Sequence, residues 1–272
     1  MRILVRTSKL AIWARRLALF AGALIVISMG LHFFGQITPD VFGISLIIGT
    51  VCAALALLTG ITAYIGLWFS GDRGWGPATL GFGLGLVCLV PAGVAFALSE
   101  IYPSTADVTT ALFDPPQLVE ARPIETDIDP ETILANFPNL ITRIYQIPPE
   151  MLFTLGQSLA RSNGWEIIAS TPPTQTSVGQ LNAIRYSLLG FENEIAFRVS
   201  PNPIGALIDL RAASLNQVYH DLGDNGRAIE DFLLALDDRV STYIRNNMAQ
   251  TETDDPPVPQ VELEPGQEPD AQ

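Results

Sequence analysis

The sequence predicts three N-terminal transmembrane α-helices followed by an α+β two-layer domain. Three observations lead to this fold class. The first third of the chain consists of long apolar runs, the composition then changes abruptly to acidic and mixed, and alternating strand patterns precede one long amphipathic helix. Within the domain the expected order is β-α-β-β-β-β-α, a mostly antiparallel sheet with helices on one face.

The membrane-spanning helices are expected at three apolar runs in a membrane anchor that covers residues 1–99. None of the runs holds a Lys, Arg, Asp or Glu, and each is long enough to cross a hydrocarbon core of about 30 Å. Lipid offers backbone polar groups no hydrogen-bond partners, so such runs fold as helices. The runs are 17–35, 41–69 and 77–98.

Basic residues gather before the first run, where five of the six in residues 1–99 are found. By the positive-inside rule, the N-terminus is expected in the cytoplasm and the domain in the periplasm of a bacterial inner membrane. The alternative is a cleaved secretory signal at residues 1–30. No A-x-A-like cleavage site follows it, and two further runs do, so a retained multi-pass anchor is favoured.

Gly81 and Gly85 form a G-x-x-x-G motif in the third run. This spacing allows the backbones of two helices to approach closely. Two uses are open: packing within the three-helix bundle, or association between copies of the chain as a homo-oligomer. The runs offer no intramembrane charge for a transport pathway, and we interpret them as an anchor in the lipid bilayer.

Residues 100–272 hold nine basic and 26 acidic residues, a net charge of −17. Such a surface repels phosphate backbones, so nucleic acid is not expected as a partner. The two cysteines, Cys52 and Cys88, both lie in the apolar runs. The exported part therefore has no disulfide framework and no thiolate metal site, and we expect no cofactor and no metal.

The exported part begins with a Pro-rich and Asp-rich stretch, 100–136, that we expect to be an extended linker or strap. Regular structure is expected from residue 140, first as a strand over 140–147. A helix over about 149–163 follows, because Leu152, Leu155 and Leu159 share one face and Gly164 ends it.

Four strands are expected next, followed by a long helix over about 224–246. Ile195, Phe197 and Val199 alternate with polar neighbours, which is typical of a sheet with one buried face. The folded domain is thus expected over 137–248, and the acidic, Pro-rich residues 249–272 are expected to be a disordered tail. The four strands are 165–170, 179–188, 192–200 and 205–213.

Four segments resemble the family catalogued as domain of unknown function 1499, and the resemblance extends over about residues 107–240. It implies a membrane-tethered or exported bacterial domain and no particular activity. Leu215 and His220 depart from the Arg and Ser common at those positions in the family. The segments are DVTTALFDPP (107–116), the FPNL–Tyr run (137–145), LGFENEIAFRV (189–199) and IDLRAAS…DLGDNGRAIEDFL (208–233).

The segment from Asp221 to Arg227 is the first candidate binding site. It opens the last predicted helix, where free N–H groups and the helix dipole attract anions. Gly223 allows close backbone approach, and Arg227 offers a guanidinium for a carboxylate or phosphate. The favoured alternative is structural: Asp221, Asp224 or Asn225 caps the helix and occupies the same N–H groups, and the arginine forms an internal ion pair.

Arg198 and Arg211 are the second candidates, on the polar face of the predicted sheet near Glu194 and Asp209. Cross-strand neighbours of opposite charge usually form a solvated lattice. If residues 107–116 of the strap cover this face instead, the two arginines are half-buried and border a pocket.

No Ser or Cys lies in a nucleophile motif, so no catalytic residue is assigned. The favoured function is a non-enzymatic module that binds an envelope protein partner or a small anionic or apolar ligand. Two alternatives are a hydrolase-like enzyme that uses Asp221, Arg227 and Arg211 on an anionic substrate, and a lipid-binding domain.

Overall fold

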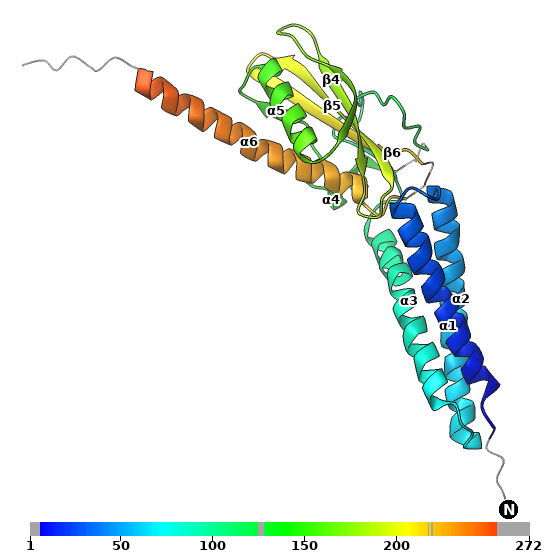
Figure 1. Ribbon diagram of the computed structural model, residues 1–272. Coiled ribbons are helices and arrows are strands. Elements are labelled where there is room, and N and C mark those ends of the chain that lie inside the picture. The colour runs from blue at the N-terminus through cyan, green and yellow to red at the C-terminus, as the bar shows by residue number, and fades with distance from the viewer. Residues whose placement is uncertain (1–5, 125–127, 217, 219, 255–272) are drawn as a thin grey trace, which may run out of the picture.

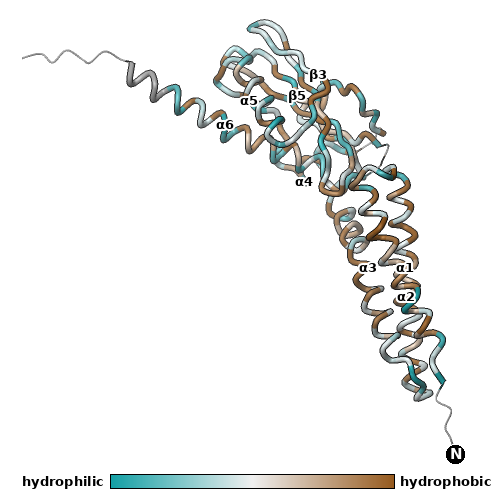
Figure 2. The backbone as a smooth tube through the Cα atoms, in the orientation of Figure 1, coloured by the Kyte–Doolittle hydropathy of each residue, from teal (hydrophilic) through white to brown (hydrophobic). Residues whose placement is uncertain are grey.

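A computed structural model describes residues 6–124, 128–216, 218 and 220–254, with side chains up to residue 247. Three N-terminal helices form an elongated bundle, and the α+β domain is placed at one end of it (Figure 1). The helices are α1 (Lys9–Phe33), α2 (Pro39–Ser70) and α3 (Trp75–Ile101). Each is long and apolar enough to cross a membrane, and Figure 2 shows hydrophobic residues along all three.

Close helix contacts in the bundle explain the G-x-x-x-G motif. A Cβ on Gly81 would lie 2.5 Å from the backbone carbon of Ala14 in α1, and one on Gly85 would lie 3.2 Å from the Ala53 carbonyl oxygen in α2. Both glycines are buried. Their packing use therefore lies within one chain, where α3 meets α1 and α2.

The domain contains a single antiparallel sheet in the strand order β1-β6-β5-β4-β3. Both β1 and β2 pair with β6, at opposite ends of the same edge. The predicted α+β class and its strands are confirmed; β1 and α4 are additional short elements within the expected strap. The domain's elements are β1 (Asp107–Thr109), α4 (Pro130–Asn136), β2 (Arg143–Tyr145), α5 (Pro149–Ser162), β3 (Glu166–Thr171), β4 (Gly179–Tyr186), β5 (Glu192–Asn202), β6 (Gly205–Ser214) and α6 (Asp224–Asp254).

The core lies between the sheet and helices α5 and α6. Alternation along β5 turns Phe197 and its apolar neighbours to the helices, where its ring lies 5.9 Å from that of Phe232 in α6. Trp165 stacks on the other side of Phe232, with the ring centroids 5.0 Å apart. Burying each large apolar side chain contributes about 1.5–3 kcal/mol, which makes this face the main source of stability.

A strap, residues 110–122, crosses the opposite face of the sheet. Its anchor is Glu194, which is completely buried. The Glu194 carboxylate accepts hydrogen bonds from the backbone N–H groups of Val119, Glu120 and Ala121 at 2.7–2.8 Å. The Asn182 side chain donates a fourth at 2.8 Å. The polar face predicted from alternation is therefore covered by chain.

Helix α6 is longer than the sequence predicts, since it continues past Asn246 to Asp254. Its far part extends away from the sheet (Figure 1). The first residues of the expected tail, 249–254, thus have helical backbone. The remainder of that tail, 255–272, lies outside the described residues.

The domain contacts the helix bundle through the turn between β4 and β5, residues 187–191, which we term the hairpin tip. The ring of Phe191 lies 5.4 Å from that of His32 near the end of α1. His32 stacks on Phe42 of α2 at 4.4 Å. A second contact joins His220 to the end of α3, where its Nε2 lies 3.4 Å from the Ser99 carbonyl oxygen.

Candidate functional site

A cavity of about 410 Å³ lies where the domain meets the bundle. Three parts of the chain enclose it: the end of α3, the hairpin tip and the segment from Ser214 to Arg227. The lining residues are Val94, Leu98, Ser187, Leu188, Leu189, Phe191, Glu192, Asn193, Ser214, Asn216, Val218, His220, Asp221, Leu222, Asp224 and Arg227.

The two ends of the cavity differ in chemistry. Val94 and Leu98 of α3 and the apolar side chains of the hairpin tip provide hydrophobic walls. Leu188 at the tip is 90 % exposed, although the tip lies against the ends of the membrane helices. The polar lining comes from the strand ends and the start of α6. A molecule with one apolar and one polar part matches this distribution.

The height of the cavity relative to a bilayer follows from the length of α3. Its 27 residues rise about 40 Å, roughly 10 Å more than a hydrocarbon core. If the excess is shared between the two ends, the core boundary lies near Leu98. Val94 is then inside the hydrocarbon layer and Tyr102 just outside it. With that division of the length, the cavity lies at the level of the boundary between acyl chains and headgroups.

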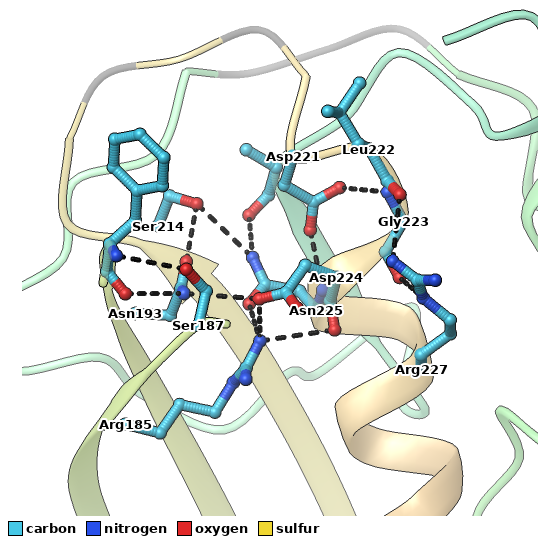
Figure 3. Close-up of polar contacts among 12 residues, drawn as sticks. Arg185, Ser187, Asn193, Ser214, Asp221, Leu222, Gly223, Asp224, Asn225 and Arg227 are labelled. Carbon is cyan, nitrogen blue, oxygen red and sulfur yellow. Dashed lines mark hydrogen bonds and ion pairs between the residues drawn. The ribbon is translucent and has the colours of Figure 1, made fainter. Parts of the chain in front are cut away.

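A buried polar cluster borders the cavity, and Figure 3 shows how its side chains converge. Arg185 at the end of β4 forms an ion pair with Asp224 and also donates to the Asp224 carbonyl oxygen at 3.2 Å. Asn225, completely buried, donates to the Ala106 carbonyl oxygen at 2.9 Å. The cluster fixes the start of α6 against the strand ends.

Asn193 and Ser214 join this cluster from β5 and β6. The Ser214 hydroxyl donates to the Asn193 side-chain oxygen at 2.7 Å. Asn193 is 2 % exposed, and its amide nitrogen lies 3.5 Å from a carboxylate oxygen of Asp224. These polar groups are thus held in place by one another.

Asp221 caps the start of α6. Its carboxylate accepts the N–H of Gly223 at 2.9 Å and that of Asn225 at 2.7 Å. Burial raises the pKa of this carboxyl, the two backbone hydrogen bonds oppose the rise, and the charge of Asp224 adds to it. The capping interpretation is what the geometry matches, because the N–H groups that an anion would use are occupied.

The two residues after Asp221 have unusual backbone conformations. Leu222 has φ of 58°, which is uncommon for a residue with a side chain, and it lines the cavity. Gly223 has φ of 76°, and a Cβ there would collide with the ring of Tyr102. Only glycine lets the loop pass this close to the end of α3.

Arg227 lies at the cavity with its guanidinium fixed but without a carboxylate. Its Nε donates to the Gly223 carbonyl oxygen at 3.1 Å and an Nη donates to that of Leu222 at 3.2 Å. The guanidinium carbon lies 5.1 Å from the centroid of the Tyr102 ring. The ion pairs found among the described residues do not include Arg227, so the internal ion pair expected for this arginine is wrong, and its guanidinium is held by backbone carbonyl groups instead.

Arg198 and Arg211 lie apart from this site, on the strap side of the sheet. Arg198 pairs with Asp114 of the strap at 2.8 Å and with Asp209 at 3.1 Å. Arg211 binds Asp107 through two hydrogen bonds of 2.9 and 2.7 Å. The strap half-buries both arginines, as the second interpretation required, but neither lines the cavity.

The structure thus brings Asp221, Gly223, Asn225 and Arg227 together and adds residues that sequence reasoning missed. Arg185 could have been found from the sequence. It continues the alternating apolar positions of β4 and therefore shares their buried face. The α3 residues and the hairpin tip had none, since their approach depends on how the domain sits on the bundle.

The described residues contain no group of three side chains suited to a metal ion. The two cavity serines are also engaged: the Ser187 hydroxyl accepts the N–H of Phe191 at 3.0 Å, and Ser214 bonds Asn193. Neither hydroxyl has a histidine among the hydrogen-bond partners found in the described part of the chain.

Fold and site together define a membrane-anchored α+β domain with a cavity at its junction with the anchor. Residues 107–236 match the family described as "Protein of unknown function (DUF1499)", and the domain belongs to that family. No curated protein and no solved structure matched the chain. The family match agrees with the resemblance seen in the sequence and assigns no activity.

Proposed function

We propose that this protein is a non-enzymatic lipid-binding module of the bacterial inner membrane, with its domain on the periplasmic side. Its cavity receives an acyl chain of a lipid from the adjacent leaflet. The orientation rests on the basic residues before α1. The ligand class rests on the cavity.

The observation that carries the proposal is that a membrane helix forms one wall of the cavity. Val94 and Leu98 belong to α3, at the depth where acyl chains end. A cavity with such a wall lies directly beside the acyl chains of the bilayer. Burying apolar surface there gives about 25 cal/mol per Å², so a hydrocarbon chain is the ligand that gains most.

Two other ligand classes receive less support from the same contacts. A small anion at the start of α6 would compete with the Asp221 carboxylate for its N–H groups. A hydrolase would need an activated nucleophile, and the two cavity serines are engaged in hydrogen bonds that hold the turn and the strand ends. The apolar walls also favour hydrocarbon.

Photo-cross-linking tests the proposal directly. The full-length protein is placed in lipid nanodiscs that contain a phospholipid with a diazirine near the end of one acyl chain. After irradiation, labelled peptides are mapped by mass spectrometry. We expect label on the peptides that contain the cavity-lining residues of the hairpin tip and of the start of α6, in addition to label on the outer surface of the three helices.

Two variants of α3 provide the matched comparison. Leu98→Trp places a larger side chain into the cavity and should reduce label at the hairpin tip to background. Phe96→Trp is the control, because Phe96 is 68 % exposed and does not line the cavity. Label confined to α1–α3 in the wild type, or unchanged at the tip in Leu98→Trp, would contradict the proposal.

A further inference from the structure

We propose that Arg227 recognises the phosphate group of the bound lipid, so the ligand is a phospholipid and not a neutral lipid with the same chains. This inference rests on the proposed function, and it adds the chemistry of the headgroup. It is carried by three features of Arg227: its fixed geometry, its height relative to the membrane and the lack of a carboxylate partner for it in the described part of the chain.

The guanidinium of Arg227 is oriented before any ligand arrives. Two backbone carbonyl oxygens, of Leu222 and Gly223, accept from its Nη and Nε. The ring of Tyr102 lies below it, and Tyr102 in turn stacks on Phe137 with the centroids 5.4 Å apart. A preorganised guanidinium loses little side-chain entropy on binding and presents its remaining N–H groups to a phosphate oxygen.

The height of Arg227 suits a phosphate. Tyr102 directly follows the last residue of α3, at the level just outside the hydrocarbon core. Phospholipid phosphates occupy this interfacial layer in a bilayer. A lipid whose acyl chain enters beside Val94 and Leu98 therefore has its headgroup close to Arg227. The same cavity thus contacts both the chain and the headgroup of one lipid molecule.

The acidic residues of the cavity have contacts of their own with groups other than Arg227. Asp224 is neutralised by its ion pair with Arg185. Both oxygens of Asp221 accept backbone N–H groups, and burial raises the pKa of its carboxyl. The Glu192 carboxylate accepts a hydrogen bond of 3.4 Å from the Tyr186 hydroxyl, across the hairpin of β4 and β5. Arg227 is the cavity-lining cation without a carboxylate partner among the described residues.

The test compares two lipids that differ only in the phosphate. Full-length protein in detergent is incubated with equal amounts of dioleoylphosphatidic acid and dioleoylglycerol, and native mass spectrometry measures the occupancy by each. One charge-assisted hydrogen bond corresponds to about a tenfold preference. We expect the wild type to favour the phosphatidic acid by about that factor and Arg227→Gln to bind both lipids equally.

Three controls make the result specific. Arg227→Lys keeps the charge and should retain part of the preference, which separates charge from fold. Arg122→Gln removes an exposed arginine of the strap that is also held by backbone carbonyls, and the preference should be unchanged. A large excess of inorganic phosphate should not displace the lipid; if it did, the site would be one for free phosphate.

The outcomes separate the two proposals. If Arg227→Gln still favours the phosphatidic acid, the headgroup inference is wrong while the lipid-binding function stands. If the wild type binds neither lipid, the proposed function fails and the headgroup inference fails with it. Equal binding of both lipids by the wild type also overturns the role of Arg227.

Discussion

Glu194 illustrates how one residue can fasten a long segment without regular structure. Its carboxylate accepts four hydrogen bonds, three of them from consecutive backbone N–H groups of the strap. A buried carboxylate is costly unless its oxygens are satisfied. Here the strap supplies the donors, so the path of the strap and the burial of Glu194 depend on each other.

Replacing Glu194 by Ala should therefore release the strap. The three N–H groups lose their acceptor, and we expect the free energy of unfolding to fall by about 3 kcal/mol. Hydrogen exchange at residues 119–121 should accelerate in parallel, measured by mass spectrometry on the full-length protein. Glu120→Gln, an exposed carboxylate of the same strap, should leave both readouts unchanged. Unaltered exchange in Glu194→Ala would show that other contacts hold the strap.

Asp221 predicts a pH dependence with a definite sign. Burial raises the pKa of its carboxyl above the ordinary 3.8. A carboxyl group whose pKa is higher in the folded than in the unfolded state stabilises the fold fully at pH values below its pKa in the unfolded state. This contribution to stability is lost as the pH rises through its pKa in the folded state. The Asp221→Asn variant has no titratable group at this position. Its Tm should therefore rise relative to that of the wild type between pH 4 and pH 7.

Thermal unfolding of the full-length protein in one detergent, at several pH values, measures this difference. The comparison cancels every titration that the two proteins share. A constant difference for Asp221→Asn would refute the assignment of the raised pKa to this carboxyl.

At the residue scale, the sequence predicted which charged residues share one face of the sheet, but it did not predict the residues with which they pair. Alternation assigned Glu194, Arg198 and Arg211 to one polar face of the sheet, which is where they lie. It did not reveal that Asp107 of β1 would pair with Arg211 and Asp114 of the strap with Arg198. Those contacts join positions far apart in the chain, and the periodicity of hydrophobic residues predicts only local structure.

Among the elements, helix α3 gives the sharpest prediction because two of its glycines differ in surroundings. Gly81→Ala would force a Cβ against the backbone of Ala14, whereas Gly83 has nothing within 4 Å of the corresponding position. We expect Gly81→Ala to destabilise the bundle by about 1–3 kcal/mol through overpacking. Gly83→Ala should be neutral in the same assay, thermal unfolding in detergent. Equal effects of the two would argue against the close contact.

The elements themselves were largely readable from sequence. Apolar runs gave the three membrane helices, and Pro149 and Gly164 marked the limits of α5. The missed elements are β1 and α4, which are short and depend on tertiary contacts: β1 has three residues and exists by pairing with β6. The length of α6 was underestimated, since residues 247–254 are mostly polar and carry no apolar stripe.

For the whole molecule, the arrangement predicts which side of the membrane each loop occupies. Alkaline phosphatase fused after Ser104 should be active, because the enzyme folds only outside the cytoplasm and α3 has by then been completed. A fusion after Ser70, at the end of α2, should be inactive. Activity is measured in intact cells with matched expression levels. The reverse pattern would place the domain in the cytoplasm and invert the proposed orientation.

The cavity depends on the arrangement of the whole molecule, and it was therefore the feature that the sequence predicted least well. Its walls come from α3, the hairpin tip and the segment before α6, which are distant in the chain. Their meeting requires the domain to dock on the bundle through Phe191 and His220. The sequence identified Asp221 and Arg227 at the polar end and could not show that a membrane helix forms the other.

The connection between anchor and domain also limits how far the protein can act. Only residues 102–106 separate the end of α3 at Ile101 from the first strand at Asp107. Even fully extended, the six peptide steps between those two residues reach about 20 Å. The domain therefore works within one protein diameter of its own bilayer. A molecule held further from that membrane must diffuse to its surface before this protein can meet it.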